Sequence, residues 1–375
     1  MPETFSHKKV RVLFVLTKLN KNGAVLSVLS TLRHLDKERF EPVLFLAERL
    51  DEPHYWQPLL EGVQVVYGLA PARTWPHRSP LWLRQLIGAA WRADVVVGAQ
   101  EASSTYFAIL AAKLTRRPVL GLIQNSLPDH LRQLPRIHHF LVKLLYPHLT
   151  GAVAVSSGVK ESLEKLVPAL ARRTAVAYNL IEVEKIRAAA QQGEAPTQPC
   201  IVAVGRLSYQ KGFDLLLRAY AALRAQGVEH TLVILGDGKQ QANLEQLAGQ
   251  LGIEEHVVMP GFVDNPYPWI GGAALFVSSS RYEGFCRVIA EALAVGTPVV
   301  ATDCPSGPAE VLEGGRYGVL VESGNVTALA QGIYALLCDP ERLQTLSELG
   351  PARAKAFAVG TAPKAFEKAV LAALR

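Results

Sequence analysis

The stretch KKVRVLFVLTKLNKNGAVLSVLSTLRHL, residues 8–35, decides the fold. Residues 10–16 form a continuous apolar and β-branched run of strand length, and residues 22–35 place apolar side chains at helical spacing. Gly23 lies at the start of the second segment. A strand, a glycine loop and a helix in this order open a parallel α/β unit, so the chain is predicted to be an α/β protein.

The same alternation continues along the chain and then restarts. Strand-length apolar runs separated by helical or loop segments are typical of buried parallel strands. Before residue 181 the further runs are FEPVLFLAE, VQVVYGL, ADVVVGAQ, PVLGLIQN, TGAVAVSS and RTAVAYN. After residue 199 they are IVAVGR, HTLVILGDG, HVVMPG, ALFVSSS, TPVVATD and YGVLVE. Two doubly wound, Rossmann-like domains that share a cleft follow from this pattern.

The predicted domain boundaries follow from composition. An N-terminal domain is expected over residues 1–180, and a polar, turn-rich interdomain hinge over 181–199. A C-terminal domain is expected over 200–355. Residues 356–375 are amphipathic, and we expect them to form a C-terminal helix that packs on the N-terminal domain.

Composition narrows the class of protein. No apolar run approaches the roughly 18 residues that span a bilayer, so a soluble protein is expected. The N-terminal apolar stretch is short and is followed by Lys18, so no signal peptide is expected. Four cysteines are scattered without a CxxC pair, which argues against a disulfide framework and a zinc site. The expected location is the reducing cytoplasm.

Charge is distributed unevenly between the two halves. Residues 1–180 hold 23 Lys and Arg against 13 Asp and Glu, a net charge of +10, and residues 181–375 hold 16 against 20, a net charge of −4. Such asymmetry favours an anionic partner for the first half: a membrane surface, nucleic acid or an anionic substrate. Because the basic excess is dispersed and no recognition motif accompanies it, no nucleic-acid partner is expected.

Two glutamates, Glu283 and Glu291, are the first candidate site residues. Glu283 is expected in a loop before a helix and Glu291 within that helix, which stops at Gly296. Eight positions separate the two backbones by about 12 Å, more than the roughly 5 to 9.5 Å between the carboxylates of a glycosidase. The spacing suits two ends of one extended ligand, such as a nucleotide sugar. The alternative is a helix-start carboxylate and a solvated helix residue.

Two cations follow the first strand of the second half. In VGRLSYQKGFDLLLRAY the strand ends at Arg206, and Lys211 precedes a helix that begins after Gly212. Doubly wound sheets bind ligands at this carboxyl edge. Arg with Lys is a common pair for binding a diphosphate, although a solvated loop pair is the alternative.

Several ordered segments resemble the GT4-type retaining glycosyltransferases, which have the GT-B fold and a Glu-x7-Glu motif. The resemblance is strong over about residues 200–325 and weaker over the first half. The segments of the second half are VGRLSYQKGFDLL, ILGDG, PGFVDNPY, SSSRYEGFCRVIAEALAVGTPVVATDCPSGPAEVL and YGVLVESGN. Those of the first half are NKNGAVLSVLSTL, AVSSGVKESL and VAYNLIEVEKI.

The resemblance implies roles for four charged residues. Arg206 and Lys211 neutralise the diphosphate of a nucleotide-sugar donor and stabilise charge as that diphosphate departs. Glu291 binds the ribose hydroxyls, and Glu283 holds the hydroxyls of the transferred sugar. Glu283, Arg206 and Lys211 are therefore the expected catalytic residues.

Further donor contacts are implied on neighbouring loops. Gly284, Phe285 and Cys286 supply backbone N–H groups to phosphate and sugar, and Phe262 and Val263 lie beside the base. Members of the family work without a divalent metal on the diphosphate, so neither a metal nor a cofactor is expected. The chain has no DxD segment or His/Asp cluster of the kind that would bind one.

The chain departs from the family pattern at two places in its first half. Many relatives have two adjacent glycines in the first loop, where this chain has Asn22 before the donor-binding candidate Gly23. Asparagine tolerates positive φ, so the same turn is expected. Relatives often carry a histidine where this chain has Gln124 and Asn125. These two and the nearby His130 are the acceptor-site candidates.

The expected activity is transfer of a hexose or N-acetylhexosamine, with retention, from a UDP-sugar to a glycan or lipid-linked acceptor in surface-glycan assembly. One alternative is a soluble enzyme with a sugar, sugar-phosphate or polyol acceptor. The other is a non-catalytic subunit that binds sugar nucleotides.

Contact with a membrane is suggested by two segments of the basic half. Residues 74–92 and 130–149 mix aromatic and aliphatic side chains with cations, which suits the inner, anionic face of the cytoplasmic membrane. Ordinary domain helices with solvated arginines are the competing interpretation.

Overall fold

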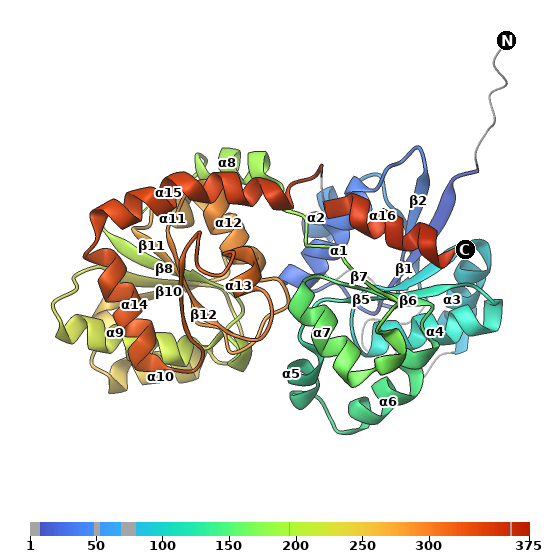
Figure 1. Ribbon diagram of the computed structural model, residues 1–375, viewed down its shortest axis with the longest axis horizontal. Helices are drawn as coiled ribbons and strands as arrows, with labels where there is room; N and C mark the ends of the chain where they lie inside the picture. The colour runs from blue at the N-terminus through green and yellow to red at the C-terminus, as the bar shows by residue number, and fades with distance from the viewer. Residues whose placement is uncertain (1–7, 49–52, 69–79, 195, 361) are drawn as a thin grey trace, which may run out of the picture. The chain divides into compact units, whose positions relative to one another are not determined.

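The computed structural model describes residues 8–48, 53–68, 80–194, 196–360 and 362–375. They form two compact units, which Figure 1 shows with the chain coloured from blue to red. Each unit has its own parallel β-sheet. The two sheets are described separately below.

The first unit, unit 1, consists of Met1–Leu180 and Val359–Arg375, and unit 2 consists of Ile181–Ala358. The segment 181–199, which we expected to be a hinge, belongs to unit 2 in this division. It holds helix α8 (Val183–Ala190), which packs against two other helices of unit 2. The last residues of the chain belong to unit 1.

The sheet of unit 1 has seven parallel strands in the order β3-β2-β1-β4-β5-β6-β7. These strands are β1 (Val10–Leu16), β2 (Phe40–Leu46), β3 (Gln64–Tyr67), β4 (Val95–Gly98), β5 (Val119–Ile123), β6 (Gly151–Ala154) and β7 (Thr174–Val176). Leu13 of β1 lies level with Val43 of β2 and with Val96 of β4. Residues 12–16 are at most 2% exposed, because helices cover both faces of the sheet.

The helices of unit 1 form a layer on each face of this sheet. They are α1 (Gly23–His34), α2 (Pro53–Trp56), α3 (Pro80–Arg92), α4 (Ser103–Thr115), α5 (Leu127–Arg132), α6 (Ile137–Leu145), α7 (Ser157–Leu166) and α16 (Ala362–Ala373). The 3-10 turns are η1 (Pro58–Leu60), η3 (Tyr146–His148) and η4 (Pro168–Leu170). In Figure 1, α1 and α16 lie on one face and α4, α6 and α7 on the other. Helix α3 packs beside α4.

The sheet of unit 2 has six parallel strands in the order β10-β9-β8-β11-β12-β13. They are β8 (Cys200–Val204), β9 (Thr231–Leu235), β10 (Val257–Gly261), β11 (Leu275–Ser278), β12 (Val299–Asp303) and β13 (Val319–Glu322). The strand order reverses direction between β8 and β11, which lie side by side. A doubly wound sheet opens a ligand-binding crevice at such a reversal.

The helices of unit 2 also form two layers. They are α8, α9 (Phe213–Ala225), α10 (Gln241–Gln250), α11 (Tyr267–Gly271), α12 (Arg287–Val295), α13 (Pro308–Val311), α14 (Val326–Leu337) and α15 (Pro340–Ala354). The 3-10 turns are η5 (Tyr209–Lys211), η6 (Glu254–His256) and η7 (Lys355–Phe357). Figure 1 shows α8, α12 and α15 on one face and α9, α10 and α14 on the other. Buried apolar side chains of α9, α14 and the strands form one core.

The C-terminal stretch differs from the single helix predicted over 356–375. Turn η7 belongs to unit 2, where Ala358 pairs as an isolated bridge with Ile181 and so leaves helical geometry. Helix α16 belongs to unit 1: Phe366 stacks on Phe14 of β1 at a ring distance of 5.5 Å, and Glu367 accepts a hydrogen bond from the N–H of Asp36 at 2.8 Å.

In the part of the chain that the structure describes, no helix combines the length and apolar character that crossing a bilayer requires.

Candidate functional site

Loops at the carboxyl ends of four strands of unit 2 converge on one place. Two of the loops follow β8 and β11, the adjacent strands between which the strand order reverses. The other two follow β9 and β12, the next strand on each side. Backbone hydrogen bonds join these loops, from Leu207 to Asp237 at 2.7 Å, from Arg281 to Gln210 at 2.8 Å and from Glu283 to Pro305 at 3.2 Å. The position matches the crevice where doubly wound sheets bind ligands.

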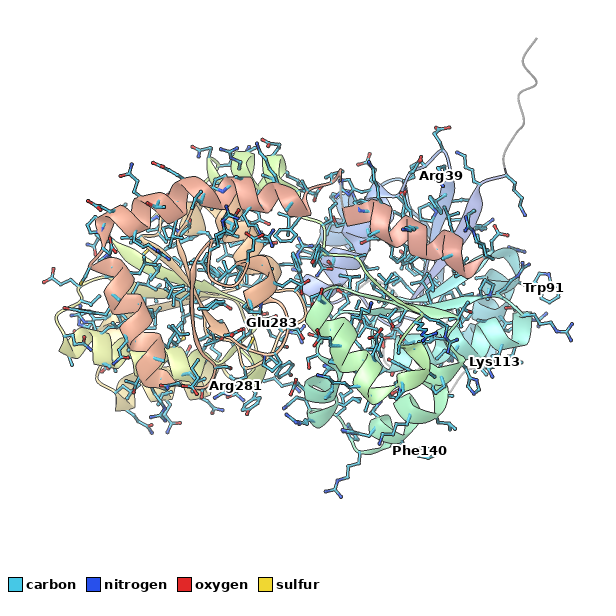
Figure 2. The ribbon with its side chains drawn as sticks, in the orientation of Figure 1. Arg39, Trp91, Lys113, Phe140, Arg281 and Glu283 are labelled. Atoms are coloured by element: carbon cyan, nitrogen blue, oxygen red, sulfur yellow. The ribbon has the colours of Figure 1, made fainter. Side chains whose placement is uncertain are left out.

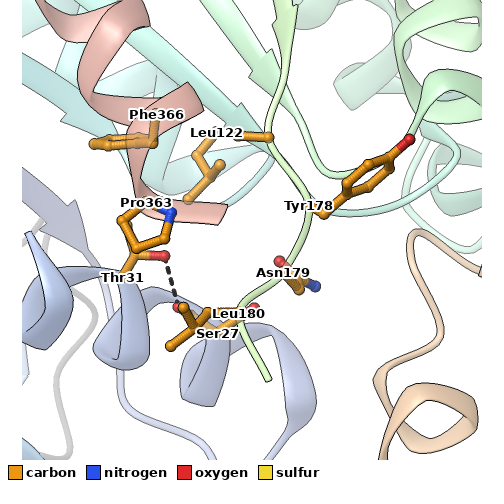
Figure 3. Close-up of a pocket in the computed structure, with 9 residues that line it drawn as sticks. Ser27, Thr31, Leu122, Tyr178, Asn179, Leu180, Pro363 and Phe366 are labelled. Carbon is orange, nitrogen blue, oxygen red and sulfur yellow. Dashed lines mark hydrogen bonds between the residues drawn. The ribbon is translucent and has the colours of Figure 1, made fainter. Parts of the chain in front are cut away.

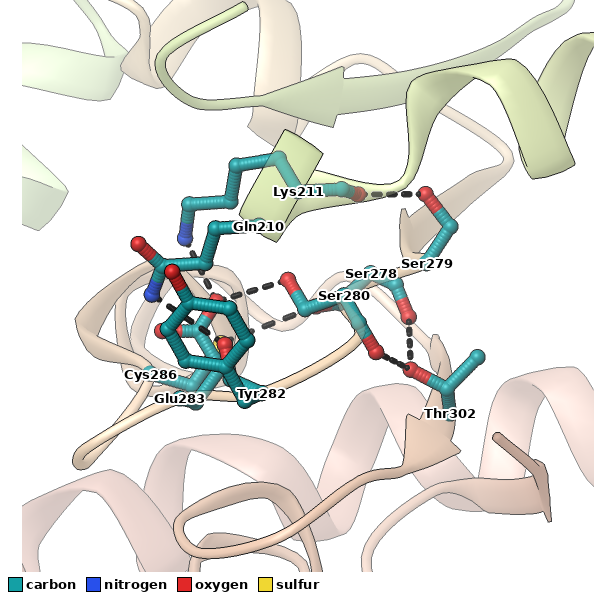
Figure 4. A network of polar contacts seen from close by, with 9 residues as sticks. All are labelled: Gln210, Lys211, Ser278, Ser279, Ser280, Tyr282, Glu283, Cys286 and Thr302. Atoms are coloured by element: carbon teal, nitrogen blue, oxygen red, sulfur yellow. Dashed lines mark hydrogen bonds and ion pairs between the residues drawn. The ribbon is translucent and has the colours of Figure 1, made fainter. Parts of the chain in front are cut away.

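A buried ion pair occupies this place. Lys211 Nζ donates to Glu283 Oε1 at 2.6 Å, and the side chains are 17% and 7% exposed. Ser280 Oγ donates to the same carboxylate oxygen at 2.7 Å (Figure 4). Burial alone would lower the pKa of Lys211, but the adjacent Glu283 carboxylate outweighs it and raises that pKa above its ordinary value. Lys211 is therefore a cation at neutral pH.

Two buried thiols lie beside the pair and carry no charge. Burial first, and then the charge of Glu283, raise the pKa of Cys286 to about 12 and hold that of Cys304 well above its ordinary value. Cys286 Sγ is 3.6 Å from Ser278 Oγ. Within the described residues no three His, Cys, Asp or Glu side chains gather into a possible metal-binding group.

Gly212 lets the loop that carries Lys211 approach the end of β11. It has φ of 62°, and a Cβ at this position would lie 2.2 Å from the carbonyl oxygen of Ser279. Ser279 Oγ in turn donates to the carbonyl of Lys211 at 2.9 Å (Figure 4). Only glycine combines this φ with such a close approach, so Gly212 fixes the position of the Lys211 backbone.

Arg281 fastens the same two loops from outside the buried pair. Its guanidinium donates to both carboxylate oxygens of Asp214, at 2.8 and 2.7 Å, and lies over the ring of Tyr209 at 4.3 Å. Figure 2 labels Arg281 and Glu283, which follow the same strand. The sequence analysis did not identify Arg281. Its position in a polar run directly after a buried strand was the available signal.

Glu291 lies in α12, as predicted, and its side chain is buried. Cys286 is the N-cap of this helix, with φ of 62°, and Gly296 ends it in the left-handed region. Arg287 donates to Glu291 Oε1 at 3.2 Å, and the two side chains are 15% and 10% exposed. The alternative interpretation of Glu291 as a solvated helix residue is therefore wrong.

The other predicted donor residues of unit 2 lie on its loops. Arg206 directly follows β8 and is exposed, and the structure gives it no ion pair with any described residue. Phe262, 40% exposed, and Val263 follow β10. Gly284 and Phe285 lie between Glu283 and the start of α12. Of the two predicted cations, Lys211 is thus buried and paired and Arg206 is accessible.

Two segments that carry predicted residues of unit 1, the start of α1 and the loop after β5, meet at Gln124. Its Nε2 donates to the carbonyls of Ala24, in the first turn of α1, and of Ala99, at 3.1 and 3.3 Å. Gly23 is the first residue of α1, so the amide of Gln124 lies at the loop that leads into this helix. Two carbonyl acceptors fix which end of the amide is nitrogen.

Glu101 holds the loop that carries Gln124 and Asn125. One oxygen of its carboxylate accepts hydrogen bonds from the backbone N–H groups of both residues, the second at 2.7 Å. Sequence reasoning did not select Glu101. An acidic residue shortly after β4, the strand beside β5, was the signal that could have found it.

The turn expected at Asn22 is wrong, and the structure also places His130. Asn22 does not adopt positive φ: it is extended, with φ of −145°, and caps α1 by accepting from the N–H of Val25 at 2.9 Å. The cap satisfies a helix N–H that would otherwise lack a partner, which favours the extended backbone. His130 lies in α5 and is partly buried.

A shallow pocket lies elsewhere in unit 1, at the end of β7 between α1 and α16. Figure 3 shows its lining, where Thr31 Oγ1 donates to the carbonyl of Ser27 at 3.0 Å. The residues that line it are Ser27, Thr31, Leu122, Ala177, Tyr178, Asn179, Leu180, Pro363 and Phe366. None of them is a predicted site residue.

Comparison with protein families assigns both halves of the chain. The model described as "Glycosyltransferase Family 4" matches residues 21–185, and the model described as "Glycosyl transferases group 1" matches residues 184–353. The chain belongs to the GT4 glycosyltransferases. The resemblance to the GT4 family, inferred from the ordered segments, is thereby confirmed.

Curated relatives align with this GT4 protein over part of their length. An N-acetylgalactosamine-N,N'-diacetylbacillosaminyl-diphospho-undecaprenol 4-alpha-N-acetylgalactosaminyltransferase of Campylobacter jejuni is 35% identical over 59% of this chain and 60% of the relative. The lipopolysaccharide core biosynthesis glycosyltransferase LpsE of Rhizobium meliloti is 36% identical over 40% of this chain and 43% of the relative. The matched region thus spans about half the length of these relatives.

Solved structures share the fold over nearly the whole GT4 chain. A crystal structure of Anabaena Alr3699/HepE in complex with UDP and glucose has a TM-score of 0.81 and 22% identity, covering 97% of this chain and 100% of that one. The lipopolysaccharide outer core galactosyltransferase WaaB has a TM-score of 0.70 and 18% identity, covering 97% and 99%. The two parallel-sheet units are the Rossmann-like domains of the GT-B fold.

Proposed function

We propose that this GT4 protein transfers a hexose or N-acetylhexosamine from a UDP-sugar to a glycan or lipid-linked acceptor, with retention of the anomeric configuration. The observation that carries the proposal is the buried Lys211–Glu283 pair at the carboxyl edge of unit 2. A cation and a carboxylate side by side match a ligand in which a diphosphate joins a hydroxyl-rich ring.

On donor binding, Lys211 and Glu283 would contact different parts of the same ligand. Lys211 turns from Glu283 toward the diphosphate, and the accessible guanidinium of Arg206 adds a second cation. Glu283, held through Ser280, then accepts hydrogen bonds from hydroxyls of the sugar. Backbone N–H groups of residues 284–286 and the positive N-terminal end of α12 complete the phosphate site.

Glu291 would bind the ribose of the donor. Its second carboxylate oxygen is available for the two ribose hydroxyls while Arg287 holds the first. This role gives a reason for keeping the Arg287–Glu291 pair largely buried in α12, since removing charged groups from water is costly. Phe262 and Val263, after β10, would lie beside the uracil ring.

The proposed reaction breaks the bond between the anomeric carbon and the leaving phosphate oxygen while the acceptor oxygen bonds to the same carbon from the same face. The acceptor hydroxyl gives its proton to the departing phosphate oxygen. Lys211 and Arg206 stabilise the negative charge of the diphosphate as it leaves. The protein supplies no nucleophile, which fits the neutral thiols of Cys286 and Cys304. We propose no metal ion for this step.

Relatives support the donor and acceptor classes. The Campylobacter jejuni protein is named for transfer of N-acetylgalactosamine to an undecaprenol-linked sugar, and LpsE for lipopolysaccharide core synthesis. The HepE crystal structure is a complex with UDP and glucose. In unit 1, Gln124 would accept a hydrogen bond from an acceptor hydroxyl through Oε1, because its two side-chain N–H groups already donate to Ala24 and Ala99, and the neighbouring Asn125 would add a second amide.

A panel of UDP- and GDP-sugars tests the proposal on the purified full chain. We expect UDP and one UDP-sugar to raise the melting temperature, because ligands that bind the folded state stabilise it by mass action. The product made from that donor should keep the anomeric configuration by NMR, at a rate unaffected by EDTA. Absence of stabilisation by any nucleotide sugar would reject the proposal. Stabilisation without turnover on lipid-linked or glycan acceptors would favour a binding subunit, and turnover on free sugars the small-acceptor enzyme.

A further inference from the structure

Three neighbouring helices of unit 1 expose large apolar side chains to solvent. Among the described residues, the four most exposed large hydrophobic side chains are Trp91 of α3, Phe140 and Ile137 of α6 and Leu114 of α4, at 65, 60, 55 and 57%. Leu110 of α4 and Leu144 of α6 are also exposed. Figure 2 labels Trp91 and Phe140, whose side chains project from unit 1. Clustered exposure of this kind marks an interaction surface.

Ring contacts and one hydrogen bond join the three helices side by side. Phe107 of α4 meets Trp82 of α3 at a ring distance of 4.7 Å, and Tyr106 stacks on His138 of α6 at 5.9 Å. Arg117, just after α4, donates to the carbonyl of Trp91 at 2.8 Å. Leu110 follows Tyr106 by one turn and Phe107 by three positions, so it lies between the two neighbouring helices, and Leu114 lies one turn further.

The three helices themselves carry charge of one sign. Helices α3, α4 and α6 contain no Asp or Glu, whereas Lys113 and Lys143 are exposed beside Leu114 and Leu144 in their sequences. Arg116 follows α4, and Arg136 precedes α6; both are exposed. Cations in the last turn of a helix also interact favourably with its dipole. That effect accounts for Lys113 and Lys143 but not for the apolar side chains around them.

We infer that this surface, the α3–α4–α6 face defined by Trp91, Leu110, Leu114, Ile137, Phe140 and Leu144 with its surrounding lysines and arginines, rests on an anionic phospholipid membrane. Apolar and aromatic side chains enter the boundary between headgroups and acyl chains, while Lys and Arg meet the anionic headgroups. A second copy docking by the same face would bring like charges together. The membrane therefore fits the surface better.

The exposed residues of this face differ from those that the sequence suggested for membrane contact. Within 74–92, the residues up to 79 lie outside the described part, and Trp82 and Leu86 belong to the core. Helix α4, which the sequence analysis had not selected, contributes Leu110, Lys113 and Leu114. The inference goes beyond the proposed function, because it does not depend on which sugar or acceptor the site takes.

Co-sedimentation of the full chain with vesicles tests the inference. One variant, Phe140→Ser with Leu144→Ser, removes apolar side chains, and another, Lys113→Glu with Lys143→Glu, reverses charge. Tyr334→Ser and the pair Arg218→Glu with Lys355→Glu make matched changes at exposed positions of unit 2. Circular dichroism and melting temperature establish that each variant is folded.

The wild type and both control variants should sediment with vesicles of phosphatidylcholine and phosphatidylglycerol but not with phosphatidylcholine alone. Each variant of the α3–α4–α6 face should lower the partition coefficient by at least about tenfold. Equal sedimentation of all variants, no sedimentation of the wild type, or sedimentation with both vesicle types would overturn the inference. So would a wild-type dimer, seen by sedimentation velocity, that the face variants turn into monomers.

The same proteins separate this inference from the proposed function. Stabilisation by UDP should be equal in the wild type and in the face variants, because the face lies in unit 1 and the ion pair in unit 2. Loss of vesicle binding with UDP binding intact supports the face. A wild type that binds vesicles but no nucleotide sugar counts against the proposed function alone.

Discussion

The two units place different chemistry at the same edge of the same kind of sheet. In unit 2 the loops bring Lys211 and Glu283 into buried contact, and the Arg281–Asp214 pair fastens those loops from outside. In unit 1 the loop after β5 presents the amide of Gln124, and Glu101 holds that loop through backbone N–H groups. At this edge unit 2 brings oppositely charged side chains together, whereas unit 1 presents a neutral amide.

The largest effect on stability should come from breaking the buried pair of unit 2. Lys211→Ala leaves the carboxylate of Glu283 buried, with Ser280 as its one remaining side-chain partner among the described residues, and the free energy of unfolding should fall by about 3 to 5 kcal/mol. Urea denaturation measures it. Lys355→Ala, at an exposed lysine of the same unit, should change it by less than about 0.5 kcal/mol. Equal effects of the two substitutions on the free energy of unfolding would contradict the claim that Lys211 stabilises the fold through its ion pair.

The next effect concerns the close approach of the two unit 2 loops. Gly212→Ala should lower the free energy of unfolding for two reasons. The strained φ costs about 1 kcal/mol, and steric overlap of the new Cβ with Ser279 costs about 1 to 3 kcal/mol more. Gly227 also has positive φ, of 85°, but a Cβ there meets no atom within 4 Å. Gly227→Ala should therefore show the first cost alone. If both variants unfold at the same urea concentration, the loops do not depend on Gly212.

A smaller effect is expected in unit 1. Glu101→Ala leaves the N–H groups of Gln124 and Asn125 without their acceptor, which should cost about 2 kcal/mol. In transfer assays it should raise KM for the acceptor and leave KM for the donor unchanged. Glu161→Ala, at an exposed glutamate of unit 1, is the matched control. A raised donor KM in the Glu101 variant would contradict the assignment of the acceptor to unit 1.

The smallest effect is a pH dependence of the Arg281–Asp214 pair. Burial would raise the pKa of Asp214, but hydrogen bonds from Arg281 outweigh it and hold that pKa below its ordinary value of 3.8. The stabilisation is therefore present above about pH 4 and is lost as pH falls through the lower, folded-state pKa. For this half-exposed carboxylate it amounts to less than about 1 kcal/mol. Asp214→Asn should remove that part of the acid dependence in urea titrations between pH 3 and 6. An unchanged acid limb would show that the pair does not titrate as described.

The fold was predictable because buried parallel strands have an unmistakable composition. All thirteen apolar runs named in the sequence are strands, and the central strands of each sheet are buried because helices cover both of its faces. The C-terminal stretch was predicted less well. Its amphipathic pattern does not show that Ala358 pairs with Ile181, a contact made by residues far apart in the sequence.

Part of the site was also predictable, and the limit is again the distance along the chain. Lys211, Glu283 and Glu291 could be selected because each lies near the end of a strand or in the helix after it. That Lys211 and Glu283 touch could not be read from the sequence, since 72 positions separate them. Arg281 and Glu101 were missed for the same reason: their residue types are common on surfaces, and only their partners distinguish them.

The most direct test of the central claim separates the fold from the chemistry of the ion pair. The double variant Lys211→Met with Glu283→Gln removes both charges, so its free energy of unfolding should lie within about 1 kcal/mol of the wild type. Its rate of sugar transfer, measured with the UDP-sugar that most stabilises the wild type, should still be at least about a hundredfold lower. A double variant that regains both stability and wild-type transfer would contradict the claim that this pair binds the donor.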